Sequence, residues 1–437
     1  MSGKSDRNYQ RRIRVSTDCK KETHDKWGGL LIALCAVCYF VSYISRINYG
    51  AVILEIERSE DISKVAASMA VTGSFITYGF GQLISGWMGD RMKPERLIFA
   101  GLLISALMNA LVPSFPRPSL ILIFWCINGF AQALMWPPMV KILSAFLDEE
   151  GYKKGCVRVT WGSSAGTIAV YLMAPVCIMW KGWKSLFFLC AGIALIFAFL
   201  WMRWIFAVEM KLGRGEKPNA PAAEKREKSA QRKEKAGGNR FSAQWPMLAL
   251  IMAAIVMQGI LRDGITTWMP SYVSDTFHLD SSISILTGVV LPVFSIICLE
   301  LVSVLNRKMI QNELICAATV FFAGFCGALL LAFLPSFGVG LSISLAALVT
   351  GCMYGVNVIL VSMIPPYFKN SGNVSAVSGL LNACTYVGSA LSSYGIALVA
   401  QGRGWGAVLW LWAAAALAGT ALSLGCRKRW WRFRRSC

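Results

Sequence analysis

The chain has 437 residues, of which 56% are hydrophobic and only 15% are charged. Soluble proteins carry about 25% charged residues, so this composition excludes a set of soluble domains. The 43 Lys and Arg residues outnumber the 23 Asp and Glu residues, but these cations lie in tails and loops between long apolar runs. The sequence therefore predicts an integral membrane protein that does not bind nucleic acid, although a net charge of +20 alone would permit that binding.

Twelve apolar runs approach or exceed the roughly 20 residues that a helix needs to cross a bilayer. They are 28–54, 66–88, 97–114, 119–146, 156–179, 184–207, 246–273, 283–304, 314–335, 340–364, 374–400 and 405–425. The stretch LGRGEKPNAPAAEKREKSAQRKEKAGGN divides them into two sets of six, and its charged, Pro- and Gly-containing composition is typical of a flexible linker. We expect an all-α membrane protein with twelve transmembrane helices in two pseudo-symmetric six-helix bundles.

Lys and Arg accumulate on the cytosolic side of membrane proteins, which predicts the orientation of the chain. With the N-terminus inside, 34 of the 43 cations fall in inside segments and six fall in outside loops. Both termini are therefore expected in the cytosol of a cell whose inner membrane holds the chain. The expected segments are a basic tail (1–27), a first bundle (28–207), a linker (208–245), a second bundle (246–426) and a basic tail (427–437) that rests on anionic lipid.

The loop GWMGDRMKPERLIFAG joins the second and third runs on the cytosolic side. Its residues Gly86, Asp90, Arg91 and Arg96 form a pattern that is similar to the signature loop of the major facilitator superfamily. A carboxylate and two cations at a helix end can latch two bundles together, so we expect these four residues to act in gating.

Two arginines lie deep in apolar runs, Arg46 in the first and Arg262 in the seventh. An arginine at mid-bilayer costs about 2.5–3.5 kcal/mol on insertion scales, and such residues usually face a polar cavity. The two lie at similar depths, so we expect them on opposite walls of one cleft. Asp263 follows Arg262 directly, but neighbouring helix residues do not face each other, so we expect an anionic substrate rather than Asp263 to neutralise the arginines. Purely structural pairing is the alternative.

Aromatic residues accompany these arginines. Tyr39, Tyr43 and Arg46 have i, i+4, i+7 spacing and share a helix face, and Tyr78 and Gln82 share a face of the second run. Tyr354 and Tyr386 add hydroxyls from the tenth and eleventh runs. Packing is the alternative role for each tyrosine.

The segments YFVSYISRINYG, TYGFGQLISGWMGDRMKPERLIFAGLL, MWPPMVK and LRDGITTWMPSYVSD resemble the organophosphate:phosphate antiporters. The resemblance implies that Arg46 and Arg262 hold a phosphate group, surrounded by Tyr39, Tyr43, Tyr78, Tyr354 and Tyr386. It also implies exchange of a phosphorylated metabolite for inorganic phosphate. Lys141 stands where relatives carry a cation, and it either lines the cleft or supports the bundle.

Three residues of this chain differ from those of the organophosphate carriers, and the differences affect the expected substrate. Gln82, Ala165 and Thr287 stand where the family's glycerol-3-phosphate carriers have a lysine, a histidine and a glutamate, so a larger, less charged or non-phosphorylated anion is expected. We find no catalytic constellation, no metal-ligand cluster and no GxxxxGK[ST] loop, so neither an enzyme nor a cofactor is expected.

The predicted function is that of a monomeric secondary transporter, which exchanges a small phosphorylated organic anion for inorganic phosphate. Two alternatives remain open. One is a transporter-like sensor of an external phosphorylated metabolite, and the other is a proton-coupled organic-anion symporter that would use Glu55, Asp263 or Glu300.

Overall fold

The computed structural model describes residues 3–62, 64–212, 220–277, 281–334 and 338–435, and helix is the only regular secondary structure in them. The prediction of an all-α protein is therefore confirmed. The elements in chain order are α1 (Gly3–Ala51), α2 (Ile53–Ser59), α3 (Lys64–Arg91), α4 (Pro94–Ser114), α5 (Pro118–Ala133), α6 (Trp136–Phe146), α7 (Glu149–Lys181), α8 (Trp183–Lys211), α9 (Ala220–Phe277), α10 (Ser281–Lys308), α11 (Glu313–Phe333), α12 (Val339–Asn357), the π-helical η1 (Val358–Met363), the 3₁₀-helical η2 (Pro365–Ser371) and α13 (Val374–Arg435).

Ten stretches of the described residues are long and apolar enough to cross a membrane. They lie in α1, α4, α5 with α6, α7, α8, α9, α11, α12 with the η turns, and the two arms of α13. The 28-residue helices α3 and α10 pack on α5 and α12 in the same assembly, and they complete the twelve predicted spans. The chain is a multi-pass membrane protein.

The helical path has two breaks that the sequence explains. Within α13 the backbone leaves helical geometry at Gly404, whose φ of 76° suits glycine and few other residues, and this turn separates the last two spans. Between α5 and α6 the chain turns at Leu134, and Pro137 follows in the first turn of α6, where a missing N–H costs nothing.

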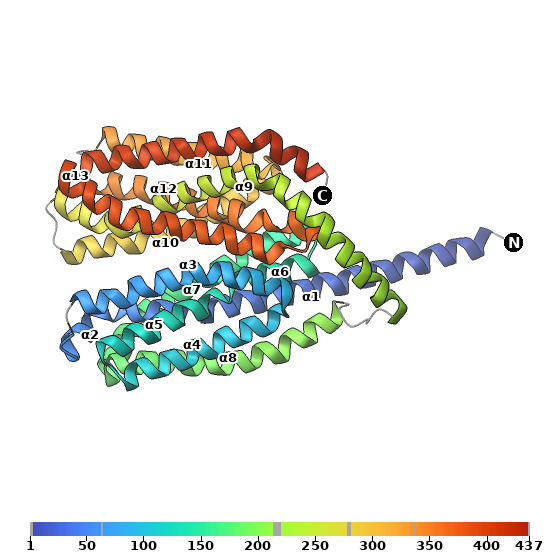
Figure 1. Ribbon diagram of the computed structural model, residues 1–437, viewed down its shortest axis with the longest axis horizontal. Coiled ribbons are helices and arrows are strands. Elements are labelled where there is room, and N and C mark those ends of the chain that lie inside the picture. The colour runs from blue at the N-terminus through green and yellow to red at the C-terminus, as the bar shows by residue number, and fades with distance from the viewer. Residues whose placement is uncertain (1–2, 63, 213–219, 278–280, 335–337, 436–437) are drawn as a thin grey trace.

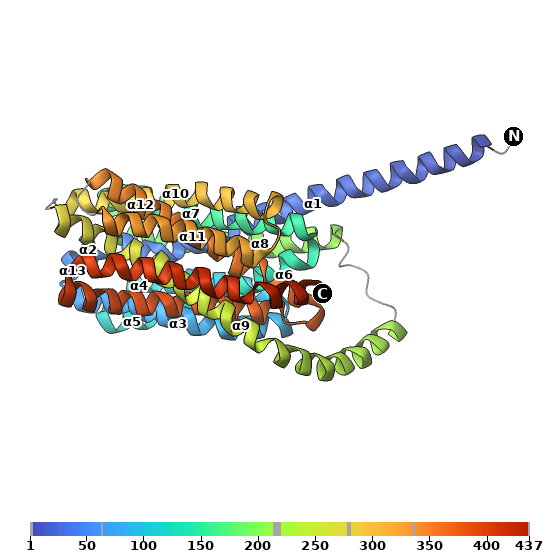
Figure 2. The same ribbon diagram turned by 90° about the horizontal axis from the view of Figure 1, so that it is seen from above.

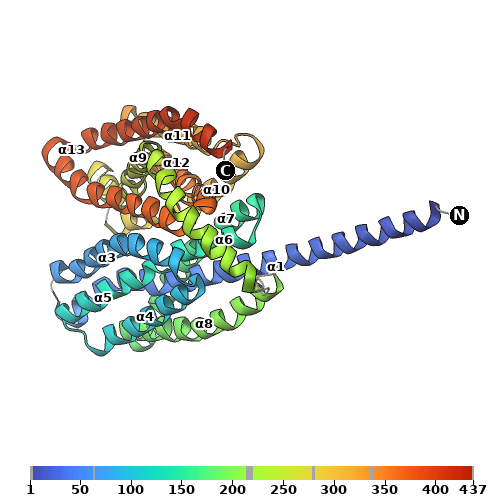
Figure 3. The same ribbon diagram turned by 45° about the vertical axis from the view of Figure 1, so that its right-hand side comes forward.

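The helices form two bundles, α1 to α8 and α9 to α13, which lie side by side (Figures 1 and 3). The first part of α1 and the first part of α9 project from the same end of the assembly, and the C-terminal end of α13 lies there too (Figure 2). Both termini and the central connection thus share one end, as the predicted orientation requires. We refer to it as the cytosolic end, its sidedness in the membrane remaining a prediction.

The structure differs from the expected flexible linker. Residues 220–245 are the first part of α9, whereas 213–219 lie outside the described residues. Ala, Glu, Lys and Arg dominate this stretch and all have high helix propensity, so a helix that continues into the apolar part of α9 is favoured over coil. The limits of the five predicted segments stay predictions.

Candidate anion-binding site

Arg46 lies among aromatic rings from both bundles. Its guanidinium carbon is 3.9 Å from the ring centroid of Tyr78 on α3 and 5.6 Å from that of Tyr43 on α1. Its Nη2 donates a hydrogen bond of 3.2 Å to the hydroxyl of Tyr386 on α13. The rings of Tyr78 and Tyr386 are 4.6 Å apart, so α1, α3 and α13 converge on this one guanidinium. Among the residues that the structure describes, Arg46 forms no ion pair.

Arg262 on α9 has a different environment. Its Nε and Nη2 donate to the two carboxylate oxygens of Asp263 at 2.7 and 2.8 Å, and its guanidinium carbon is 5.4 Å from the ring of Tyr354. The expectation that Asp263 does not neutralise Arg262 is therefore wrong. Adjacent Cβ atoms point about 100° apart on a helix, but the long arginine side chain bends back to reach its neighbour.

Close packing between α9 and α13 places this ion pair. A Cβ atom on Gly259 would lie 2.3 Å from the carbonyl oxygen of Thr385, so only glycine allows the two helices to approach this closely. Asp263 is one turn along α9 from Gly259, and Ser389 is one turn along α13 from Thr385. The Ser389 hydroxyl consequently donates to the carboxylate of Asp263.

The structure brings most of the predicted residues to one neighbourhood. Tyr386 of α13 accepts a hydrogen bond from Arg46, and Ser389, three residues further along the same helix, holds the carboxylate of Asp263. The side chains of Arg262 and Asp263 are 13% and 28% exposed, so part of the ion pair faces open space. Tyr39 lies at the edge of this group, where its ring is 5.0 Å from that of Tyr43.

Gln82 and Lys141 form hydrogen bonds with groups other than the two arginines. Gln82 is fully buried between the bundles, where it donates to the carbonyl oxygen of Ala133 at 3.4 Å and accepts a hydrogen bond of 2.9 Å from Asn382 on α13. The Lys141 ammonium donates to the carbonyl oxygens of Gly89 and Asp90 at 2.6 and 3.0 Å. Lys141 therefore supports the cytosolic end of the bundle, which is the second of the two roles predicted for it.

Asp90 connects the bundles at the cytosolic end. Its carboxylate accepts hydrogen bonds of 3.0 and 2.7 Å from the backbone N–H groups of Ser375 and Ala376, in the first turn of α13. A helix start offers unpaired N–H groups and a partial positive charge, so a carboxylate is stabilised there. At Gly86 a Cβ atom would come within 2.8 Å of the Ser375 carbonyl oxygen, so this glycine allows the close approach.

The two arginines of the predicted gate do not join that contact. Arg91 lies 4.3 Å from the ring centroid of Trp87 on its own helix, and Arg96 is exposed on α4. The expected latch of one carboxylate and two cations is instead a carboxylate, a helix start and Lys141, whose ammonium is 3.8 Å from the Asp90 carboxylate.

A second contact between the bundles surrounds Glu313, the first residue of α11, which the sequence analysis did not identify. This fully buried carboxylate accepts hydrogen bonds from Tyr367 at 2.7 Å, Trp430 at 2.9 Å and Lys153 at 3.2 Å. Lys153 belongs to α7 of the first bundle, whereas the other donors belong to the second. Together with the Asp90 contact, it closes the cytosolic end.

Glu149 of α7 extends the same contact. It pairs with Lys153 at 3.0 Å and with Arg434, near the end of α13, at 3.0 Å. Arg434 also lies 3.4 Å from Glu313, so the basic C-terminal segment joins both bundles rather than resting only on lipid.

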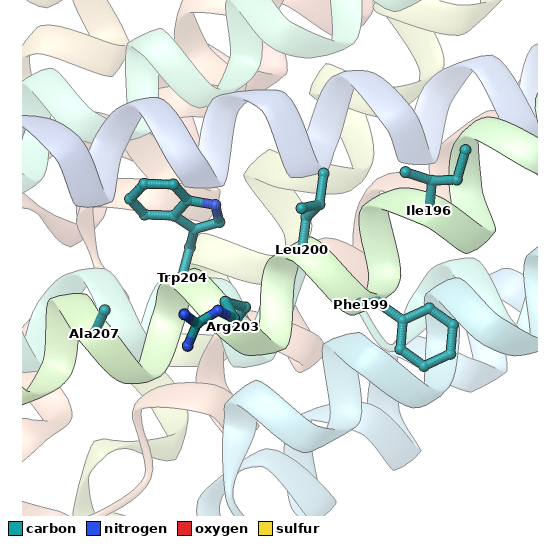
Figure 4. A pocket seen from close by; sticks show the side chains of 6 residues that line it. All are labelled: Ile196, Phe199, Leu200, Arg203, Trp204 and Ala207. Carbon is teal, nitrogen blue, oxygen red and sulfur yellow. The ribbon is translucent and has the colours of Figure 1, made fainter.

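A surface hollow on α8 is separate from the arginines. It has a volume of about 640 Å³ and is lined by Ile196, Phe199, Leu200, Arg203, Trp204 and Ala207 (Figure 4). Four of these side chains are large, apolar and 46–65% exposed, as expected for a helix face in contact with hydrocarbon. The predicted anion ligands are absent from its lining.

Polar residues within apolar runs are the sequence signal that could have identified the α13 residues in contact with Gln82 and Asp263. Asn382, Thr385 and Ser389 recur at three- and four-residue spacing in α13, and they share a face with Tyr386. In the first bundle, Asn48 donates to Asn109 at 2.7 Å in a similar buried amide contact. Thr287 belongs to a part of α10 whose side chains lie outside the described residues.

Relatives agree with the resemblance to organophosphate carriers. The glycerol-3-phosphate transporter of Bacillus subtilis is 30% identical over 36% of this chain and 36% of its own length, and a probable hexose phosphate transport protein of Chlamydia muridarum is 28% identical over 32% and 31%. The Membrane sensor protein UhpC of Escherichia coli is 22% identical over 58% of this chain and 59% of its own length. The chain thus spans only about a third of the first two relatives' length.

Solved structures show the fold. The proton:xylose symporter XylE has a TM-score of 0.72 at 12% identity, covering 91% of this chain and 95% of its own. A bacterial homologue of ferroportin in its outward-facing state has a TM-score of 0.70 at 11% identity, covering 91% and 99%. The sequence model of the Major Facilitator Superfamily matches residues 35–393, most of the chain. The predicted twelve-helix fold is therefore confirmed, and the chain belongs to the Major Facilitator Superfamily.

Proposed function

We propose that this protein is a secondary transporter that exchanges a small phosphorylated organic anion for inorganic phosphate by alternating access. The main support is the environment of Arg46. Its guanidinium lies within the membrane, contacts Tyr78 and Tyr386 of the two bundles, and lacks an ion-pair partner among the described residues. Burying an unpaired charge is costly, so a bound anion is its natural partner. The phosphate-ester names of two relatives support the phosphorylated class.

The proposal includes an inner-membrane location, cytosolic termini and a monomeric transporter. Arg46 supplies the charge, Arg262 lies beyond it across the bundle boundary, and Tyr43, Tyr78 and Tyr386 enclose the guanidinium of Arg46. The closed cytosolic end leaves binding to occur from the opposite side in this state.

The test is counterflow of labelled phosphate in reconstituted vesicles. Wild-type protein should exchange external label for internal phosphate or phosphoester, and Arg46→Lys should reduce the rate about 100-fold, because an ammonium does not reproduce the two-pronged contact of arginine with phosphate. Arg203→Lys, on the exposed face of α8, is the matched control and should retain the rate. Normal exchange by Arg46→Lys would contradict the proposal.

Two observations favour alternatives that the same vesicles distinguish. The likeness to a membrane sensor favours a receptor, which would bind the anion without counterflow. The partly exposed Asp263 favours a proton-coupled symporter, in which an imposed pH gradient would drive net uptake without internal phosphate.

A further inference from the structure

The charges around the site do not balance a doubly charged ligand. Arg46 and Arg262 contribute two positive charges, and the carboxylate of Asp263 contributes one negative charge. Asp263 lies in direct contact with Arg262, at 2.7 and 2.8 Å. The second-bundle side of the site is thus a neutral ion pair, and one uncompensated positive charge remains, on Arg46.

The ion pair also occupies the part of Arg262 that a phosphate would use. Nε and Nη2 form one of the edges through which a guanidinium binds two oxygens at once, and both donate to Asp263. The Ser389 hydroxyl holds the same carboxylate from the neighbouring helix. A dianion that bridges both arginines must displace a carboxylate that is tethered to the adjacent residue and is held by a second helix.

Asp263 gives the site a second property. Its side chain is 28% exposed, more than that of its partner, so its oxygens have room for a further hydrogen bond. An ionised carboxylate only accepts hydrogen bonds, so it favours a hydroxyl group that donates one and repels a second negative charge.

We infer that the site selects a singly charged phosphodiester that bears a hydroxyl group, with the phosphate on Arg46 and the hydroxyl on Asp263. A phosphomonoester carries a charge of −1.5 to −2 at pH 7, whereas a diester carries −1. A diester therefore cancels the charge of Arg46, and a monoester brings an additional charge toward Asp263. This inference rests on the proposed anion site and narrows its substrate class.

Binding of two small probes to purified protein tests the inference. Glycerol-3-phosphate is the monoester and glycerophosphoglycerol, a monoanion with free hydroxyls, is the diester, and affinities are measured by calorimetry at pH 7.5. Wild type should bind the diester about tenfold more tightly. Asp263→Asn should reverse that preference, because the amide leaves the fork of Arg262 free for a second phosphate oxygen.

A second variant covers the case in which Asp263→Asn does not fold. Ser389→Ala removes only the hydroxyl that holds the carboxylate, and it should shift the ratio of the two affinities in the same direction by about threefold. Equal affinities of wild type for the two probes, or an unchanged ratio in both variants, would overturn the inference.

Arg46→Lys separates this inference from the proposed function. If the probes bind normally to Arg46→Lys, the anion site itself is wrong. If Arg46→Lys binds neither probe while the Asp263 and Ser389 variants keep the wild-type ratio of the two affinities, only the inferred substrate class is wrong.

Discussion

Replacing Glu313 by Gln should open the cytosolic end of the protein. Glu313 is fully buried and accepts hydrogen bonds from Tyr367, Trp430 and Lys153. Only Lys153 among these comes from the first bundle, so its 3.2 Å ion pair with Glu313 holds the bundles together at this end. The neutral amide keeps the size of the side chain and removes the charge.

The contacts of Lys153 set the free energy that Glu313→Gln is expected to cost. Removing one member of a buried ion pair costs about 3–5 kcal/mol when the other charge is left unpaired. Lys153 is only 7% exposed but keeps the carboxylate of Glu149 at 3.0 Å, so we expect a smaller loss, about 2–3 kcal/mol. The loss applies to the state in which the bundles meet, and it favours the open state about 30- to 150-fold.

Hydrogen–deuterium exchange detects this opening without introduced cysteines. Backbone amides of residues 149–157 and 367–371 should exchange faster in Glu313→Gln than in wild type, because local opening exposes them to water. Glu150→Gln is the matched control, since the ion pair that Glu150 forms among the described residues is an exposed i, i+4 contact with Lys154. Equal protection of these segments in Glu313→Gln and Glu150→Gln would refute the assignment of Glu313 to the closed state.

Two further predictions concern the contact between α3 and α13. Asp90→Ala removes the acceptor for two N–H groups at the start of α13, and it should increase deuterium uptake at 373–379 about tenfold in rate, with unchanged uptake as the contrary result. Gly379→Ala should lower the melting temperature, because its Cβ would meet the carbonyl oxygen of Gln82 at 2.2 Å. Gly192→Ala is its control and should be neutral or stabilising, since nothing lies within 4 Å of a Cβ there; equal melting temperatures for the two variants would oppose the close-packing argument.

Hydropathy and charge were sufficient to predict the helices. The bilayer thickness fixes the length of each span, and a span in hydrocarbon must pair its own backbone N–H and C=O groups. Hydropathy and charge also located Arg46, since a cation in an apolar run of that length must face a polar environment. The convergence of α1, α3 and α13 on its guanidinium is a tertiary property. Tyr78 and Tyr386 are far apart in sequence, and only packing places their rings together.

The error at Arg262 and the choice left open at Lys141 have a common physical origin. Helical spacing fixes the direction of Cα–Cβ bonds, whereas arginine and lysine carry three or four further rotatable bonds that let the charge reach a different neighbour. Arg262 bends to Asp263, and Lys141 extends to the carbonyl oxygens of Gly89 and Asp90. Sequence position therefore predicts the face of a helix better than it predicts the partner of a long charged side chain.

Among the described residues, Arg262 has a carboxylate counter-charge and Arg46 has none, and this difference affects the proposed exchange. Closing both ends around an empty site leaves Arg46 desolvated without a counter-charge, a penalty of about 3 kcal/mol on insertion scales. The desolvation cost of the neutral pair of Arg262 and Asp263 is offset by the attraction between the two charges, and this balance does not require a ligand. Binding a single negative charge at Arg46 removes the penalty and permits the closed intermediate. One unpaired guanidinium is therefore sufficient to make reorientation depend on a bound anion, and a second unpaired charge would require a dianion for the same step. On this reasoning Asp263→Asn should slow the return step with monoanions and restore it with dianions.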